Sequence, residues 1–220
     1  MTARHSFDTE LGHLNNELIR MGGMIEEAIG NSIKAFKNHD KELARQVIEY
    51  DRIVDEIEKT IDSRCLSLIL RQQPVARDLR AITTALKMVT DMERIADAAS
   101  DIAEITLRLE GEHIYTVVEH IPQMAEIASS MVNDAVAAFV REDVALAKQT
   151  MERDDEVDSL FDAVKEELLT AVRRGSENSD KVVDFLMIAK YLERIGDHAV
   201  NICEWVEFHE TGEYKRTRIL

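Results

Sequence analysis

The sequence has few of the residues that interrupt helices or stabilise strands. Its 220 residues include two prolines and eight glycines, and aromatic residues make up 5% of the chain. Proline and glycine are the residues least compatible with a helix interior, whereas aromatic and β-branched residues are enriched in strands. Because 45% of the residues are hydrophobic, the composition is also unlike that of a disordered chain. It therefore predicts an all-α globular protein.

Cysteines and long apolar runs are scarce as well. The two cysteines, Cys65 and Cys203, lie far apart, so nothing indicates a disulfide framework or a cysteine-ligated zinc site, and we expect two buried free thiols. No run of about 18 apolar residues could span a membrane, and the start MTARHSFDTE lacks the apolar core of a secretory signal. We expect a cytoplasmic protein without direct membrane insertion. The basic end of the sequence, at 214–220, is expected to be a frayed, solvated tail.

Basic residues are outnumbered by acidic ones. The chain has 27 lysines and arginines against 43 aspartates and glutamates, which gives a net charge of −16. Such a charge repels polyanions and argues against a nucleic-acid-binding protein. Where carboxylates converge, the same charge favours the binding of divalent or trivalent cations.

The chain contains an internal repeat. The segment at 35–57 aligns with 138–160 at an offset of 103 residues, and the segment at 92–104 aligns with 192–204 at an offset of 100. Helix breaks are indicated at matching places in both halves, such as RQQPVARD in the first and RRGSENSD in the second. The pattern predicts two pseudo-symmetric three-helix bundles, residues 1–112 and residues 113–220, in which neighbouring helices run antiparallel.

The third helix of each half carries acids in line with an apolar stripe. Because an α-helix turns about 100° per residue, the stripe of Leu79, Ile82 and Leu86 continues into acidic residues, as does the stripe of Val182 and Leu186. These acids are Glu93, Asp97, Glu104, Glu193, Asp197 and Glu204. Ordinary surface charge would lie opposite the core. A second apolar stripe is left to hold the first bundle together, formed by Met88, Met92, Ala96, Ala99 and Ala103.

The second helix of each half adds a further pair of acids one turn apart. The pairs are Asp51 with Asp55 and Asp154 with Asp158. If the second and third helices are neighbours, four carboxylates per half converge. Converging carboxylates either take up protons at raised pKa values or collect a hard cation such as Mg²⁺, Ca²⁺, Mn²⁺ or ferric iron.

Other interpretations of these acids stay open. Arg94 and Arg194 could each neutralise part of their cluster, which would give a polar seam between helices that binds nothing, and acid catalysis is a further use. His198 stands where the first half has Ala98, so it is either an additional nitrogen ligand of the second half or a hydrogen-bonded polar histidine.

The repeated strings ERIADAASDIAE and ERIGDHAVNICE, together with QPVARDLRAI at 73–82, resemble the PhoU family of phosphate-uptake regulators. The resemblance covers nearly the whole chain. It implies metal ions, such as a multinuclear iron cluster with Zn, Mn or Mg as alternatives, on the motifs Glu93/Asp97 and Glu193/Asp197. Further oxygen ligands suggested by their positions are Asp101, Asn201, Asp51, Asp55, Asp154 and Asp158.

The resemblance also implies a function without a catalytic residue. The protein would be a cytoplasmic accessory of the phosphate ABC transporter and a negative regulator of the phosphate-starvation response. Its implied partners are the ATPase subunit of that transporter, the sensor histidine kinase of the phosphate regulon and a second copy of the chain in a homodimer. Arg77 and Arg80, which have no counterpart in the second half, are either a docking patch or solvated charges at a helix start.

Three alternative functions remain. A ferritin-like di-iron protein would need Glu-x-x-His motifs, and the chain has two such spacings, Glu10/His13 and Glu110/His113, neither of which is expected in the middle of a bundle. A metal-free helical adaptor would leave the acidic seams empty. An accessory of a different phosphate permease would share the same sequence features.

Overall fold

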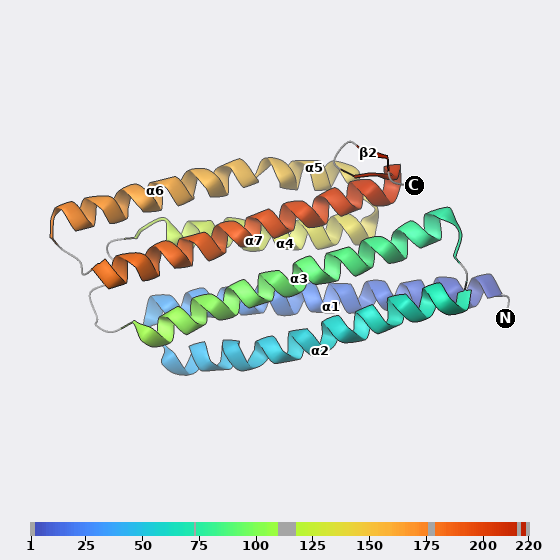
Figure 1. Ribbon diagram of the computed structural model, residues 1–220, viewed down its shortest axis with the longest axis horizontal. Coiled ribbons are helices and arrows are strands. Elements are labelled where there is room, and N and C mark those ends of the chain that lie inside the picture. The colour runs from blue at the N-terminus through green and yellow to red at the C-terminus, as the bar shows by residue number, and fades with distance from the viewer. Residues whose placement is uncertain (1–2, 73, 110–117, 176–178, 215–216, 219–220) are drawn as a thin grey trace.

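The computed structural model describes residues 3–72, 74–109, 118–175, 179–214 and 217–218 (Figure 1). Within these ranges the first half forms three helices, α1 (Ala3–Asn38), α2 (Lys41–Gln72) and α3 (Ala76–Arg108). The second half forms α4 (Ile121–Arg141), α5 (Val144–Glu152), α6 (Asp154–Arg173) and α7 (Ser179–Thr211), followed by the strands β1 (Glu213–Tyr214) and β2 (Thr217–Arg218). The predicted all-α class and tandem repeat are confirmed. The expected boundary between residues 112 and 113 lies outside the described residues.

The turns that join the first two helices of each half use the same local chemistry. Asp40 caps α2, because its Oδ1 accepts hydrogen bonds from the backbone N–H groups of Glu42 and Leu43 at 3.1 and 2.9 Å. In the second half Asp143 caps α5 by accepting from the N–H of Leu146 at 3.0 Å. Each capping aspartate follows a left-handed residue, His39 with φ 53° and Glu142 with φ 54°. The two halves therefore repeat each other in backbone conformation as well as in sequence.

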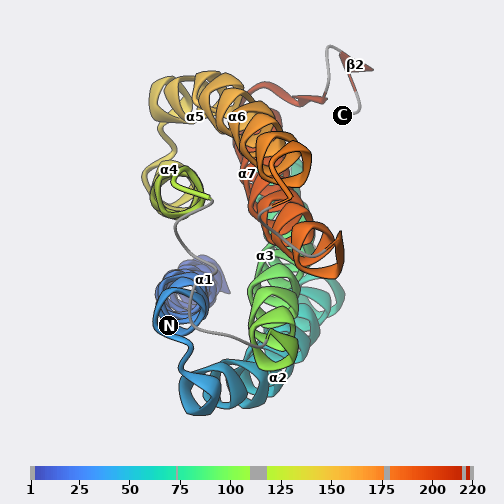
Figure 2. The same ribbon diagram turned by 90° about the vertical axis from the view of Figure 1, so that its left-hand side faces the viewer.

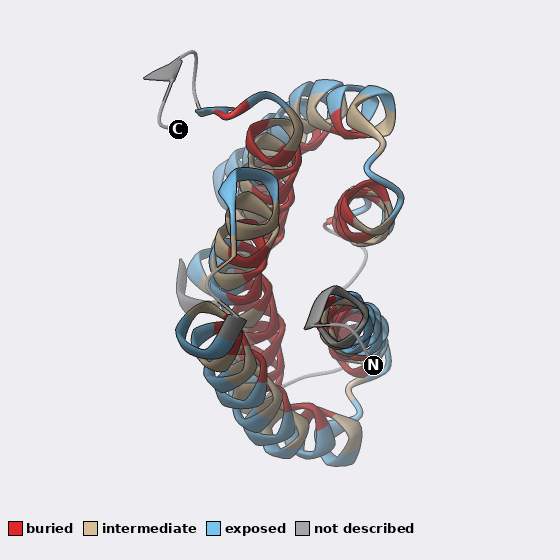
Figure 3. Ribbon diagram, turned by 90° about the vertical axis from the view of Figure 1, so that its right-hand side faces the viewer, coloured by how far each residue is buried: buried red, intermediate tan, exposed pale blue. Residues whose placement is uncertain are grey.

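The helices are arranged as a curved layer with two helices on its concave side. Figure 2 shows α2, α3, α7 and the α5–α6 pair side by side in the layer, with α1 and α4 packed inside the curve. Buried residues face the space between the layer and these two helices (Figure 3). One continuous hydrophobic core draws on helices of both halves. The two bundles are therefore fused through the contacts of α3 with α7 and of α1 with α4.

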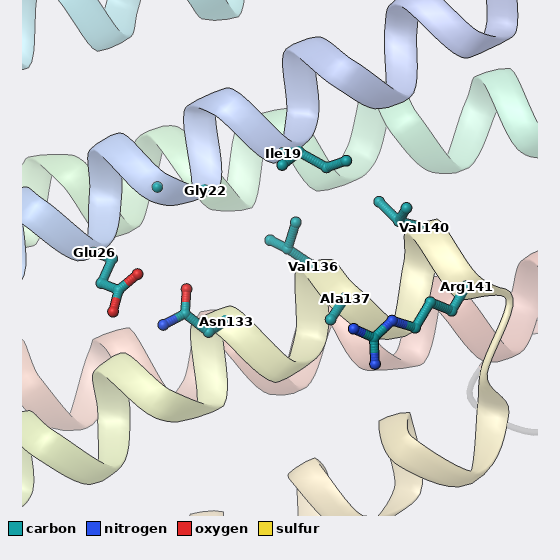
Figure 4. Close-up of a pocket in the computed structure, with 9 residues that line it drawn as sticks. Ile19, Gly22, Glu26, Asn133, Val136, Ala137, Val140 and Arg141 are labelled. Carbon is teal, nitrogen blue, oxygen red and sulfur yellow. The ribbon is translucent and has the colours of Figure 1, made fainter.

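A glycine of α1 packs against α4. A Cβ atom on Gly22 would lie 3.3 Å from Cγ1 of Val136, so a side chain at this position would require Val136 to move by a few tenths of an ångström (Figure 4). Beside this contact lies a groove of about 340 Å³. Most of its lining is apolar, including Ile19 and Val140, and its ionisable residues, Glu26 and Arg141, lie near opposite ends of it (Figure 4). The convergent carboxylates lie elsewhere.

Two features of the second half differ from the expectations. Its second helix is broken at Arg153 into α5 and α6, and the guanidinium of Arg153 donates to Ser130 Oγ and Asp134 Oδ2 on α4, at 3.1 and 2.9 Å. The frayed tail expected at 214–220 is wrong for the described residues 214, 217 and 218, because β1 and β2 pair in antiparallel orientation. Tyr214 stacks on Trp205 with ring centroids 4.0 Å apart, which anchors β1 to α7.

Two smaller expectations concern the cysteines and the membrane. Cys65 and Cys203 are buried free thiols, as predicted. None of the helices in the described ranges combines the length and the apolar character that crossing a bilayer requires.

Candidate metal centres

The first acidic cluster lies in the seam between α2 and α3. It consists of Asp51 and Asp55 on α2 with Glu93 and Asp97 on α3, all partly buried. Carboxylate oxygens of Asp51, Asp55 and Asp97 lie within 4.8 Å of one another. The structure therefore brings acids of α2 next to acids of α3, as expected for neighbouring antiparallel helices.

The electrostatics of this cluster favour a bound proton or cation. Burial raises the pKa of Asp51 to about 6, and the nearby negative charges of Asp97, Asp55, Asp101 and Glu104 contribute to this rise. Burial and then Asp97 raise the pKa of Glu93 to about 6 as well. Oδ1 of Asp51 is buried and has no hydrogen-bond partner among the described residues. A buried acceptor without a donor, next to two more carboxylates, fits a hard metal ion.

Arg94 neutralises this cluster only in part. Its Nε lies 3.3 Å from Glu93 Oε2 and its Nη1 lies 3.3 Å from Asp97 Oδ2, on a side chain that is 52% exposed. The arginine lowers the pKa of both carboxyl groups, yet burial and the other acids still hold each pKa above its ordinary value. Arg94 therefore neutralises some of the negative charge in the seam, as the polar-seam interpretation requires, but an excess of negative charge remains.

The second acidic cluster lies between α6 and α7. It consists of Asp154 and Asp158 on α6 with Glu193 and Asp197 on α7. Burial raises the pKa of Asp154 to about 6, with Asp197, Asp158 and Glu193 contributing in that order, and burial also raises the pKa of Asp197. This cluster is more open, since Asp158 and Asp197 are exposed, and Lys190 donates a hydrogen bond to Glu193. Among the described residues, the first cluster contains three carboxylates whose oxygens lie within 4.8 Å of one another, and the second cluster does not.

A glycine shapes the second cluster. A Cβ atom on Gly196 would lie 3.0 Å from Oδ1 of Asp154 and 3.6 Å from Cγ1 of Val157. At the equivalent position of the first half the chain has Ala96. The missing side chain lets the Asp154 carboxylate lie directly against the backbone of α7.

Two of the expected ligands take part in the contact between α3 and α7. The amide nitrogen of Asn201 donates to Asp91 Oδ1 at 3.2 Å, and Nδ1 of His198 lies 2.9 Å from the same oxygen. In the symmetry-related contact, the hydroxyl of Tyr191 hydrogen-bonds the Asp101 carboxylate. His198 is thus a hydrogen-bonded polar histidine, and Asn201 has only its carbonyl oxygen left for a metal. Asp101 stays near the first cluster, where its charge raises the pKa of Asp51.

Sequence reasoning missed Asp91, because its role depends on how the two halves pack. It also left open the roles of Arg77 and Arg80. Nη2 of Arg77 lies 2.7 Å from Glu142 Oε2, and Nε of Arg80 donates to the backbone oxygen of His209 at 3.0 Å. Both arginines therefore join the start of α3 to the second half, although Arg77 is 64% exposed.

The first Glu-x-x-His spacing does not form a di-iron arrangement. Glu10 pairs with Arg64 at 2.9 Å, and His13 is exposed on α1. Glu110 and His113 lie outside the described residues. The described acidic clusters contain aspartates and glutamates on two helices each, without the histidines that a ferritin-like centre requires.

Comparisons with known proteins agree with this architecture. The family model for the PhoU domain matches twice, at residues 18–106 and 121–206. The chain is 39% identical over 211 residues to the phosphate-specific transport system accessory protein PhoU homolog of Clostridium acetobutylicum, covering 96% of each chain. It is 31% identical over 207 residues to the PhoU accessory protein of Escherichia coli, covering 94% of this chain and 86% of that protein.

Two solved structures share the fold. The crystal structure of PhoU from Pseudomonas aeruginosa superposes with a TM-score of 0.86 and 34% identity, covering 94% of this chain and all of that one (100%). The phosphate transport system regulatory protein PhoU from Streptococcus pneumoniae gives a TM-score of 0.88 at 28% identity, covering 94% and 98%. The duplicated domain, the identity over almost the full length and the shared fold show that this chain is a member of the PhoU family.

Proposed function

We propose that this chain is a non-enzymatic, cytoplasmic accessory protein of phosphate-specific transport whose two acidic clusters hold metal ions. It represses the phosphate-starvation response by contacting the ATPase subunit of the phosphate ABC transporter and the sensor histidine kinase of the phosphate regulon, and it acts as a homodimer. The proposal rests on family membership, because the relatives are accessory proteins of phosphate-specific transport.

The observation that carries the metal proposal is the convergence of carboxylates that basic residues neutralise only in part, which is closest in the first half. In the first half the ion would be held by Asp51, Asp55 and Asp97, with Glu93 alongside. In the second half the corresponding ligands are Asp154, Asp158, Glu193 and Asp197. Oxygen ligands suit iron, Mn²⁺ and Mg²⁺, and Zn²⁺ is also bound by carboxylates. The bound ions would supply positive charge that offsets the repulsion between the acids.

Elemental analysis tests the metal proposal. The protein is purified in chelator-free buffer and compared with Asp97→Asn/Asp197→Asn, which removes one charge from each cluster. We expect at least one metal ion per chain in the wild type and a clear loss in the double variant, because neutralising a ligand weakens the site. Less than roughly 0.1 metal ion per chain in the wild type would instead support the metal-free adaptor.

A pull-down tests the partner proposal. Tagged protein is recovered from phosphate-replete and phosphate-starved cells, and the retained membrane complex is identified by mass spectrometry. Retention of the phosphate ABC transporter and the histidine kinase is expected, and retention of a different phosphate permease would favour the alternative accessory role. Recovery of folded protein without any phosphate transporter contradicts the proposal. Light scattering of the same sample checks for the homodimer.

A further inference from the structure

A third group of potential ligands lies at one end of the molecule, away from both acidic clusters. It consists of Glu142 in the turn between α4 and α5, with His209 and Glu210 at the end of α7. One ligand atom of each residue lies within 4.8 Å of the others. The start of α3 is at the same end of the molecule (Figure 1), so this site gathers segments from both halves.

His209 is the buried member of the group. The residue is 4% exposed, and its Nδ1 is buried without a hydrogen bond to any described residue, although Glu210 Oε1 is 3.4 Å away. Burial lowers the pKa of this imidazole below its ordinary value, so the ring is neutral at physiological pH. A neutral imidazole nitrogen that faces a carboxylate and lacks a donor is suited to a metal ion.

An arginine stands where the metal ion would bind. Nη2 of Arg77 lies 2.7 Å from Glu142 Oε2 and 3.5 Å from Glu210 Oε1, so the guanidinium already bridges the two carboxylates. Arg77 is 64% exposed and Glu142 is 50% exposed, which leaves the group open to solvent. An exposed ion pair of this kind contributes little stability and is easily replaced by a divalent cation.

We propose that Glu142, His209 and Glu210 form a separate site for a divalent transition metal of the Zn²⁺ type, which replaces the guanidinium of Arg77. Imidazole nitrogen and carboxylate oxygen are both ligands that zinc accepts, and the solvent-facing side leaves room for a water ligand. Binding would fix the α4–α5 turn to the end of α7 and would release Arg77 from its ion pairs.

The repeat sets this site apart from the acidic clusters. The clusters occur in both halves, whereas the positions equivalent to Glu142 and His209 are His39 and Leu109, at offsets of 103 and 100 residues. Leucine cannot bind a metal, so the first half has no equivalent site. The zinc-type site therefore belongs to one end of the protein, and it goes beyond the proposed function of the two clusters.

Zinc titration of the full chain tests the proposal. The chelator-treated protein carries Asp97→Asn/Asp197→Asn to weaken the acidic clusters, and Zn²⁺ binding is followed by calorimetry and by the imidazole resonances in NMR spectra. We expect one Zn²⁺ per chain with a shift of the His209 resonances. His209→Gln and, separately, Glu142→Gln should each weaken this binding at least about tenfold, as loss of a metal ligand or its support does.

Two further variants sharpen the test. His120→Gln is the matched control, because His120 also pairs with a glutamate, Glu167, at 2.6 Å, and it should leave Zn²⁺ binding unchanged. Arg77→Ala should tighten binding about two- to fivefold, since it removes the competing cation. Circular dichroism verifies that each variant is folded. If His209→Gln unfolds the protein, Glu142→Gln still tests the site, because it changes only an exposed side chain.

The outcomes separate this proposal from that of the acidic clusters. Unchanged Zn²⁺ affinity in folded Glu142→Gln and His209→Gln, or His209 resonances that do not respond to Zn²⁺, would overturn it. If the clusters bind no metal, the wild type and the Asp97→Asn/Asp197→Asn variant should give the same Zn²⁺ titration curve. Each should then bind one Zn²⁺ per chain, at the zinc-type site.

Discussion

Gly196 determines how closely the Asp154 carboxylate approaches α7. With Gly196→Ala, the added Cβ lies 3.0 Å from Asp154 Oδ1, so the carboxylate must move by a few tenths of an ångström from its present position. We expect the second cluster to lose metal while the first keeps it, which halves the cluster-bound metal in elemental analysis. The metal-free stability should hold or rise, because alanine is the better helix former by roughly 0.5–1 kcal/mol.

The control for this prediction is a glycine with free space around it. At Gly30 an added Cβ would have no atom within 4 Å apart from those of its own helix, so Gly30→Ala should stabilise the protein and leave its metal content unchanged. Equal metal content in Gly196→Ala and Gly30→Ala would show that the position of Asp154 does not matter for binding.

The raised pKa values of the clusters predict how metal-free stability depends on pH. Asp51, Glu93 and Asp154 have folded-state pKa values of about 6, above their ordinary values near 4. Between these values the folded protein holds protons that the unfolded chain has released, so stability falls as the pH rises from about 4 to 6. In chelator, we expect the free energy of unfolding to be about 1–2 kcal/mol lower at pH 7 than at pH 5, after allowance for solvent screening.

A comparison of variants separates the contribution of the clusters from that of His209. Because the pKa of His209 is lowered in the folded state, this residue makes the protein less stable as the pH falls below about 6.5, which is the opposite dependence. Asp51→Asn/Asp154→Asn should remove most of the cluster contribution, as measured by urea unfolding at several pH values. If wild type and this variant give parallel curves, the clusters do not take up protons in the folded state.

At the scale of the helices, Asp91 connects α3 to α7. Asp91→Ala leaves His198 and Asn201 without their shared acceptor, which should lower the free energy of unfolding by about 1–3 kcal/mol. Tyr191→Phe removes only the symmetry-related hydroxyl, so its expected cost is about 1 kcal/mol. Urea unfolding measures the free energy of unfolding of both variants. The control is Glu49→Ala, on the exposed side of α2, whose free energy of unfolding should lie within about 0.5 kcal/mol of the wild-type value. A similar result for Asp91→Ala and Glu49→Ala would contradict this role.

The repeat predicted most helices but not the break between α5 and α6. Arg153 aligns with Tyr50 at the offset of 103 residues, and α2 continues without a break through Tyr50, whose hydroxyl donates to Glu27 on α1 at 3.3 Å. Nothing in the sequence around Arg153 terminates a helix. Its side chain binds two residues of α4, Ser130 and Asp134, and this tertiary contact coincides with the break. Local sequence patterns do not contain such information.

At the scale of the whole molecule, predictability depends on whether a contact lies within a half or between halves. The pairing of Asp51 with Asp97 follows from helix periodicity and short connections, so the sequence was sufficient to predict it. The contacts of Asp91 with Asn201 and of Arg77 with Glu142 cross from one half to the other. A repeat specifies what each copy looks like and not how the copies pack, so these contacts could not be predicted.

Because the core is continuous across both halves, metal bound in either cluster should stabilise the protein as a whole. An ion that binds only the folded state adds about 2.7 kcal/mol at one hundred times its Kd. Like charges one turn apart cost roughly 0.2–0.5 kcal/mol per pair, so four such pairs cost about 1–2 kcal/mol, which bound metal more than offsets. Removal of metal should therefore lower the melting temperature by about 5–10 °C.

This expectation is measured by calorimetry of the metal-loaded protein with and without a chelator. The chelator should lower the melting temperature of Asp97→Asn/Asp197→Asn much less, because its clusters no longer hold the ion tightly, whereas the surface control Glu49→Gln should respond as wild type does. A single transition is expected throughout, since the helices of both halves share one core. A wild-type melting curve that the chelator leaves unchanged would mean that the acidic seams serve the fold or a partner without metal.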